Sequence, residues 1–427
     1  MNRNNTCKEA RKNLGSKKGG GKMGKKRQRK KLPAGYKKIK EPGFWAQLLK
    51  VLLFMAGLAV LHYILDWLQK RLFFPQDGWA FYSTVNVLPA FLIVFLVMLG
   101  WWMGRSRRGK AILLSTYAAV AAISVLSLLT YQYLDKDGIH VNRFWSGEKL
   151  TPWSSVSQVA FEPRMSGGKS NHLQIRSTFF SKEAEAFTLI WVDKREISTA
   201  KKKIQAQKIP VTVRPMDLAE ARAINRYKED NRNAVLELLD LKDPAPSAGR
   251  PIIGSPAAKV EIAQACAVTD NECLKLHDEI YEAFKDSVMN NELRFRFIHY
   301  PVLEDSETAA YAGEAIFRQN PPSFQKYFRE IASRRGASWS SANLATLIQT
   351  HLPGIDADRV MRELNTVSVY NAVSRDHNEA LLMGAEETPA FFVNGRKLPD
   401  VTADKSKEEM SKEIKAMINE ALGKSPF

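Results

Sequence analysis

The sequence predicts a multi-domain membrane protein with three transmembrane α-helices, a small, mostly β domain and a C-terminal α/β domain with a helical insertion. Long apolar segments follow one another between Phe44 and Leu134, and short β-branched and aromatic runs continue to Pro215. From Gly254 onward, strand and helix patterns alternate. The predicted order is a basic tail (1–43), the helices (44–134), the β domain (135–215), a helix with a linker (216–253) and the α/β domain (254–427).

Positive charge is concentrated at the N-terminus. Residues 1–41 hold 16 Lys or Arg against Glu9 and Glu41, which gives 14 of the chain's net charge of +18. The tail has too few apolar side chains for a core, so we expect it to be disordered, cytoplasmic and close to anionic lipid head groups. Most of the remaining excess of positive charge lies in short loops such as residues 105–110. The charge therefore does not indicate a nucleic-acid-binding domain.

The three apolar segments are Phe44–Leu68, Trp79–Met103 and Ala111–Leu134. Each is long enough to cross a hydrocarbon core of about 30 Å, and aromatic residues cluster at the segment ends. Buried helices of a large domain are the alternative, but the second and third segments have almost no polar face. With the tail in the cytoplasm of a bacterium, three crossings of the inner membrane place the C-terminal domains in the periplasm or outside the cell.

Residues 135–215 have strand composition, in which runs such as IHVNRFW and VSQVAFEP are separated by turn-forming stretches. A helical stretch follows at 194–207. With the step from Pro152 and Trp153 into a strand, this pattern resembles the pleckstrin-homology-like (PH-like) domains of bacterial membrane proteins. The resemblance carries over no binding residue, and we interpret Trp153 as part of the core. A lipid-binding scaffold is one alternative function that it suggests.

The most specific signal follows the linker at 243–251. A strand at Lys259–Ala265 precedes a helix that begins near Asp270, and helical residues follow at 306–382. GAEETPAFFVNGRKL then gives a Thr388–Pro389 step and a hairpin. This order resembles the DsbA-like family of thioredoxin-fold proteins. The resemblance implies a cis Thr388–Pro389 bond and, beside it, a groove that binds extended polypeptides.

The DsbA-like family places a Cys-x-x-Cys motif at the start of this helix, where this chain has Asp270-Asn271-Glu272-Cys273. The family's nucleophile is the first cysteine, so Asp270 occupies the lost nucleophile position and Cys273 that of the resolving cysteine. A carboxylate cannot form a mixed disulfide, which closes the usual route of dithiol oxidation. Asp is also a strong helix N-cap. Capping is the expected role of Asp270, and a catalytic carboxylate is the alternative.

Cys266 lies seven residues before Cys273, and Cys7 in the tail is the remaining cysteine of three. An even number outside the membrane and an odd number inside fits the predicted topology. Three interpretations of Cys266 and Cys273 stay open. They are a structural disulfide, worth roughly 2.5 kcal/mol in the chain-entropy model, a displaced redox pair, and two buried thiols.

No other catalytic pattern is present, since the seven His are scattered and neither a Walker A nor a G-x-S-x-G motif occurs. We expect His277 on the surface of its helix, and His299 and Tyr300 packed beside the sheet. We therefore expect no metal and no cofactor. The expected partners are the lipid bilayer and an envelope protein or peptide, with no nucleic acid.

The leading prediction is a non-catalytic module of the cell envelope that binds an extended polypeptide beside Thr388 and Pro389. The alternative is a thiol-disulfide oxidoreductase or isomerase that acts through Cys273, with or without Cys266. The two differ in whether Cys273 is accessible. The sequence leaves the polypeptide partner and the oligomeric state open.

Overall fold

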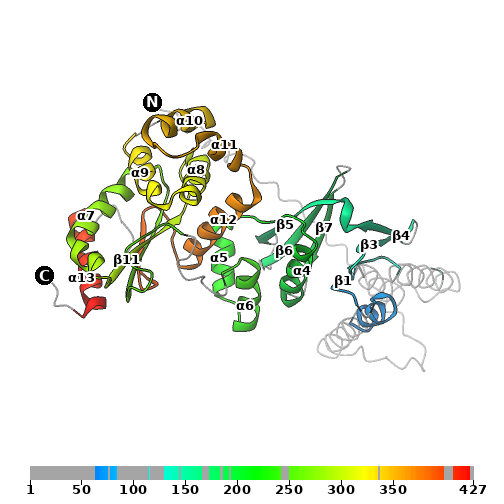
Figure 1. The fold of residues 1–427 in the computed structure, drawn as a ribbon. Coiled ribbons are helices and arrows are strands. Elements are labelled where there is room, and N and C mark those ends of the chain that lie inside the picture. The colour runs from blue at the N-terminus through cyan, green and yellow to red at the C-terminus, as the bar shows by residue number, and fades with distance from the viewer. Residues whose placement is uncertain are drawn as a thin grey trace, which may run out of the picture. The chain divides into compact units, whose positions relative to one another are not determined.

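The computed structural model describes residues 63–75, 77–83, 115, 129–143, 146–165, 173–182, 186–191, 194–241, 250–334, 337–398 and 407–423 (Figure 1). The predictions about the basic tail and about most of the three apolar segments lie outside the described residues. The described part contains three β-sheets and the helices that pack on them.

The prediction of three transmembrane helices is wrong for the part of the chain that the structure describes. No helix there is both long and apolar enough to cross a membrane. The second predicted segment begins with strand β1 (Ala80–Ser83), and the third ends with strand β2 (Tyr131–Leu134), which pairs antiparallel with β1. Short aromatic runs suit a strand as well as a helix, and here pairing decides between them. The predicted inner-membrane location depended on those helices and is withdrawn with them.

Two four-stranded sheets follow the orders β1-β2-β3-β4 and β7-β6-β5-β8. Their further strands are β3 (Gly138–Arg143), β4 (Gly147–Pro152), β5 (Val156–Met165), β6 (Leu173–Ser181), β7 (Ala186–Trp191) and β8 (Val211–Val213). Alternate residues of β5 and β6 are buried in one core with helix α4 (Lys194–Ala206). The 3₁₀ turn Trp153–Ser155 lies between β4 and β5.

Trp153 is a core residue, as the sequence indicated. Its ring stacks on Trp79 at a centroid distance of 5.4 Å, and its Nε1–H donates to Asp135 O at 2.8 Å. A buried indole needs such an acceptor for its N–H group. The likeness of this β region to PH-like domains stays a prediction.

The C-terminal sheet has the strand order β13-β12-β10-β11-β9. Its strands are β9 (Ile252–Ile253), β10 (Val260–Cys266), β11 (Leu293–His299), β12 (Ala390–Val393) and β13 (Arg396–Lys397). Helix α7 (Asn271–Met289) connects the parallel strands β10 and β11, and β12 runs antiparallel to β10. This arrangement is the thioredoxin-like fold that the sequence predicted.

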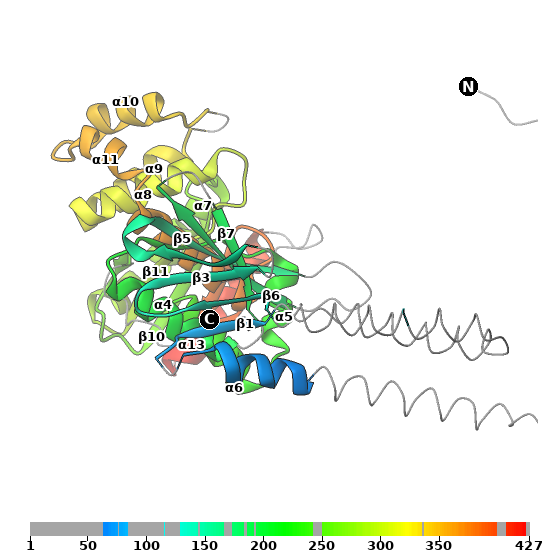
Figure 2. The ribbon, with the colours of Figure 1, turned by 90° about the vertical axis from the view of Figure 1, so that its right-hand side faces the viewer.

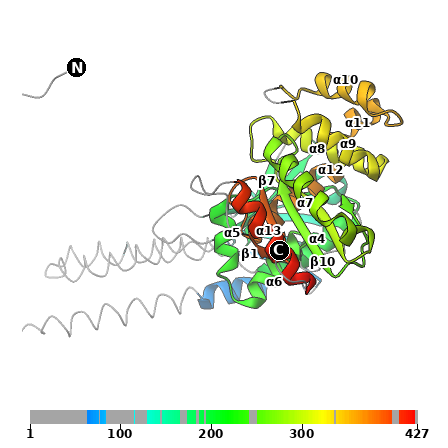
Figure 3. The same ribbon diagram turned by 90° about the vertical axis from the view of Figure 1, so that its left-hand side faces the viewer.

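Helices cover both faces of this sheet. Helices α7 and α13 (Lys407–Leu422) pack on one face and α12 (Val367–Leu382) on the other (Figure 3). Successive residues of β10 alternate accordingly, since Ile262 packs with α7 and α13 while Ala263 packs with α12. The helical insertion between β11 and α12 comprises α8 (Ser306–Gln319), α9 (Pro321–Ala332), α10 (Ser341–His351) and α11 (Ala357–Glu363). Helices α10 and α11 lie on the side of α8 and α9 that faces away from the sheet (Figure 2).

Helix α12 also contacts the edge strand β8 and the residues that follow it. Val213 N–H donates to Asn371 Oδ1 at 3.2 Å, and Met216 N–H donates to Asn378 Oδ1 at 2.7 Å. These amide side chains satisfy backbone groups that the sheet leaves unpaired. Helix α5 (Leu218–Asn225) also contacts α12, and α6 (Glu229–Leu238) packs on α4. Apolar residues of the β region and of α12 share one core.

Candidate functional site

The loop between β10 and α7 positions Asp270 and Cys273, where the family resemblance predicts a lost Cys-x-x-Cys motif. Asp270 is the N-cap of α7, and its carboxylate accepts a hydrogen bond from Glu272 N–H at 2.9 Å. The backbone N–H of Asp270 donates to Ala267 O at 3.0 Å, which tightens the loop. Only 8% of Asp270 is exposed. The capping role predicted from the sequence is therefore confirmed.

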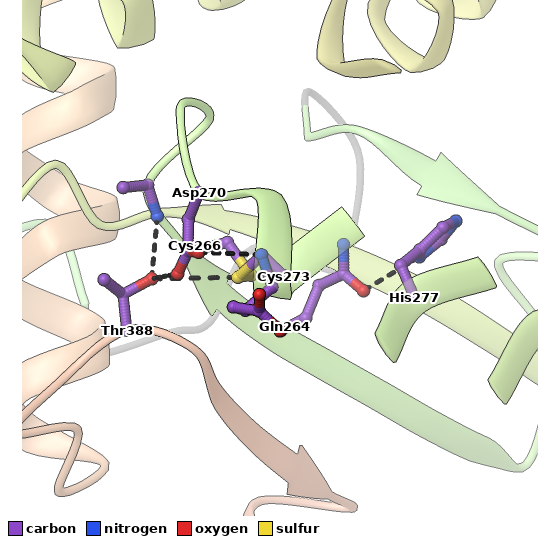
Figure 4. Close-up of a disulfide and its surroundings, with 8 residues drawn as sticks. Gln264, Cys266, Asp270, Cys273, His277 and Thr388 are labelled. Carbon is purple, nitrogen blue, oxygen red and sulfur yellow. Dashed lines mark hydrogen bonds between the residues drawn. A yellow bond between two sulfur atoms is a disulfide. The ribbon is translucent and has the colours of Figure 1, made fainter. Parts of the chain in front are cut away.

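Thr388 connects this cap to the loop that precedes β12. The Thr388–Pro389 peptide bond is cis, as the family resemblance implied. The Thr388 hydroxyl donates to Asp270 Oδ2 at 3.0 Å and accepts from Ala267 N–H at 3.1 Å (Figure 4). Its Oγ1 lies 3.7 Å from Cys273 Sγ. The fold thus brings together Asp270, Cys273 and Thr388, all of which the sequence singled out.

Cys266 and Cys273 form a disulfide in the structure, with their Cα atoms 6.1 Å apart (Figure 4). Both residues are 0% exposed. They belong to a core cluster that also contains Phe297 and Phe324. A thiolate can attack a disulfide only if it reaches one of the two sulfurs. Burial of both sulfurs therefore opposes exchange with an external thiol.

His277 was expected on the surface of its helix, and this prediction is wrong. Its side chain is buried, with 2% of the residue exposed, and Nδ1 lies 2.9 Å from Gln264 Oε1. Burial lowers the pKa of His277 to about 4, so the ring is neutral at neutral pH. The spacing from Cys273 to His277, Ile280 and Phe284 is that of one helical stripe, and this pattern could have revealed the burial.

His299, the last residue of β11, is also buried. It is 0% exposed, its backbone N–H donates to Asp376 Oδ2 at 3.2 Å, and its ring lies against Phe297 and Phe324. Burial lowers the pKa of His299 to about 4. The neighbouring Tyr300 is 2% exposed and donates from its hydroxyl to Ala385 O at 3.3 Å. Both residues pack beside the sheet, as the sequence predicted.

The sequence analysis missed a buried group of charges between β11 and α12. Arg296 Nη1 lies 3.0 Å from Glu379 Oε1, and Arg296 Nε lies 2.9 Å from Glu261 Oε1. Arg250 pairs with the same Glu379 and lies 3.3 Å from Asp376 Oδ1. Opposite charges compensate one another's burial here, so these residues tie α12 to the sheet. The signal in the sequence was the placement of Arg296 between Phe295 and Phe297 in a strand.

Comparisons with known proteins identify the C-terminal region. A family model described as thioredoxin matches residues 247–416. Curated relatives include the probable disulfide bond formation protein D of Bacillus cereus, which is 26% identical over 136 residues. The C-terminal region has a thioredoxin-like fold and resembles the DsbA-like family, and we refer to it as the DsbA-like domain. The match covers 31% of this chain and 62% of the Bacillus cereus protein, so the chain spans less than two thirds of that relative.

Solved structures similar to the DsbA-like domain include oxidised BdbD from Bacillus subtilis, at 21% identity and a TM-score of 0.36, covering 42% of this chain and 95% of that one. Another is DsbA from Chlamydia trachomatis, at 17% identity and a TM-score of 0.35, covering 41% and 93%. At the position that the sequence resemblance assigns to the family's Cys-x-x-Cys motif, this chain has Asp270-Asn271-Glu272-Cys273.

Proposed function

We propose that the DsbA-like domain is a non-catalytic module that binds an extended polypeptide beside Thr388 and Pro389. The observation that carries this proposal is the hydrogen bond from Thr388 to the carboxylate of Asp270, at the position where the family has its attacking thiol. This carboxylate accepts hydrogen bonds from Glu272 N–H in the first turn of α7 and from the Thr388 hydroxyl. Unlike a thiolate, it cannot undergo exchange with a disulfide. The domain keeps the binding loop of its family without the nucleophile.

The burial of the disulfide supports the same proposal. Exchange would require a thiolate to approach Cys266 or Cys273 along the axis of the sulfur-sulfur bond. Both cysteines are 0% exposed and packed among aromatic rings, so an approaching polypeptide meets no accessible sulfur. The disulfide then acts as a cross-link between the end of β10 and the first turn of α7.

The loop at Thr388 and Pro389 suits strand addition. Both residues are half-buried, and the pairing of β12 with β10 begins only at Ala390. Backbone groups beside the start of a strand can pair with an added strand, and the binding needs no cysteine. In the DsbA-like family the polypeptide substrate pairs at this place, and we assign the same mode to this chain.

Site-specific photocrosslinking tests the proposal. The probe is reduced and carboxamidomethylated α-lactalbumin, an unfolded polypeptide without free thiols. A benzoylphenylalanine replaces the exposed Glu387, next to Thr388, or the exposed Glu282 on α7 as the matched control. We expect crosslinks from position 387 and not from 282, with competition by unlabelled polypeptide. Equal crosslinking at both positions, or none at 387, would overturn the proposal.

A thiol-disulfide oxidoreductase is the second candidate function. It is favoured by the disulfide at the start of α7 and by the name of the Bacillus cereus relative, a probable disulfide bond formation protein. Insulin reduction by the full-length chain separates the two candidates. We expect a rate equal to background; a rate above background that disappears in Cys273→Ser would establish the oxidoreductase instead.

A further inference from the structure

A cleft of about 340 Å³ lies in the DsbA-like domain between the sheet, α7 and α9. Its walls include four phenylalanine rings from β11 and α9, namely Phe295, Phe297, Phe324 and Phe328. Among the residues that the structure describes, no Asp, Glu, Lys or Arg lines it, and neither do Thr388, Pro389 or the two cysteines. The cleft is therefore separate from the loop to which we assign polypeptide binding, and its walls favour an uncharged occupant.

One buried polar atom in this cleft has no partner within the described protein. His277 lines the cleft and is 2% exposed, yet its Nε2 makes no hydrogen bond. The other ring nitrogen, Nδ1, lies 2.9 Å from Gln264 Oε1, an acceptor, so Nδ1 carries the proton and Nε2 presents a lone pair. Figure 4 shows the His277 ring directed away from the disulfide. Buried polar atoms normally have a hydrogen-bond partner, so we expect Nε2 to accept a hydrogen bond from a donor that binds in the cleft.

We propose that this cleft binds an uncharged small molecule of about one substituted ring, which donates a hydrogen bond to His277 Nε2. The inference does not depend on the proposed polypeptide binding. Burial lowers the pKa of His277 to about 4, which keeps the ring neutral and its Nε2 an acceptor at neutral pH. The ligand therefore has to supply the proton, as a hydroxyl or an N–H group does.

The size and shape of the cleft fit such a ligand. A dry protein cavity of about 150 Å³ is enough to bind benzene, so 340 Å³ accommodates a ring with substituents. Aromatic walls attract a ring edge-on or in an offset stack. Entry is open at the rim, where Gly254, Pro321 and Pro322 are exposed. Small-molecule sites commonly combine apolar walls with one or two polar atoms that fix the orientation.

Calorimetric titration of the full-length chain tests the proposal with three probes. 4-Methylphenol has a ring and a donor, 4-methylanisole has the ring without the donor, and 4-methylbenzoate carries a charge. We expect 4-methylphenol to bind, 4-methylanisole to bind about three- to tenfold more weakly, as the loss of one neutral hydrogen bond implies, and 4-methylbenzoate not to bind. Binding of all three alike, or of none at 10 mM, would overturn the proposal.

Two variants locate the binding. His277→Phe removes the acceptor, so the preference for 4-methylphenol over 4-methylanisole should vanish. Ile253→Trp, at the half-buried rim, should close the cleft to both probes without altering His277. His351→Phe on α10, which is not one of the lining residues, is the matched control and should bind as the wild type does. Unchanged binding in Ile253→Trp would refute the assignment.

If His277→Phe does not fold, the wild-type chain still decides the question. The ¹⁵N chemical shift of His277 Nε2 reports whether this atom accepts a hydrogen bond. Addition of 4-methylphenol should shift this resonance, and addition of 4-methylanisole should not. A resonance that stays in place while 4-methylphenol binds would mean that the histidine is not the acceptor, and the proposal would fail.

Discussion

Replacement of Asp270 by Ala tests whether the carboxylate of this residue stabilises the start of α7. The substitution removes the acceptor of Glu272 N–H and the acceptor of the Thr388 hydroxyl. Loss of an N-cap costs about 1 kcal/mol, and loss of a hydrogen bond to a charged group costs about 2 kcal/mol. Since Asp270 is 8% exposed, solvent replaces little of either bond. We expect the free energy of opening of this region to fall by about 3 kcal/mol.

Hydrogen exchange measured by mass spectrometry on the full-length chain reports this change locally. A loss of about 3 kcal/mol corresponds to exchange roughly 100-fold faster in peptides from the first turns of α7. Asp270→Asn is the matched control, because Asn caps as well as Asp and keeps a neutral acceptor for Thr388, so its cost should stay near 1 kcal/mol. Exchange in Asp270→Ala within threefold of the wild type would refute the reasoning.

Three other contacts lead to measurable expectations. Asp270→Cys places a thiolate at the N-terminus of α7, where it should attack Cys273 Sγ, release Cys266 as a thiol and form a new disulfide with Cys273 that supports peptide oxidation. Proteolytic mapping that finds the introduced thiol free and Cys266 still bonded to Cys273 would withdraw Asp270 as the nucleophile's equivalent. The folded pKa of His277 is about 4 against 6.5 normally, so the unfolded chain binds more protons between these values. Stability should be lost as pH falls from 6.5 to 4, by about 3 kcal/mol more in the wild type than in His277→Phe, as urea titrations would show. Asn378→Ala leaves Met216 N–H without its acceptor at a cost of about 1–3 kcal/mol, and exchange of that amide should accelerate while Asp270→Asn leaves it unchanged.

Several parts of the DsbA-like domain could be predicted because their signals are local. An Asp before an amphipathic segment specifies an N-cap, and Asp270 is one. The Asn394-Gly395 pair specifies a tight hairpin, and both residues have the positive φ values, 47° and 79°, that such a turn requires. Strands β12 and β13 pair across it. These features depend on a few consecutive residues, so one sequence is enough to place them.

The predictions that were wrong concern contacts between distant parts of the chain. Strands β1 and β2 pair although Ala80 and Leu134 are far apart in sequence, and nothing local in either run distinguishes a strand from the end of an apolar helix. His277 was misplaced for a related reason. Helix α7 packs on the sheet and also contacts α9 and α13, so it is buried on more than one side. The spacing of the sequence places His277 on the stripe of Cys273, Ile280 and Phe284, but it does not show how many neighbours cover that stripe.

The Thr388 hydroxyl explains how a carboxylate and a disulfide coexist at one site. A hydroxyl has one proton and two lone pairs. The proton is donated to Asp270 Oδ2, and one lone pair accepts from Ala267 N–H. In the disulfide, Cys273 Sγ has no proton, so its 3.7 Å separation from Oγ1 is a van der Waals contact. Reduction would give Cys273 a thiol proton that the second lone pair can accept, while Asp270 keeps its bond. The cap is thus compatible with both redox states, and reduction alone neither releases the carboxylate nor provides an exposed nucleophile.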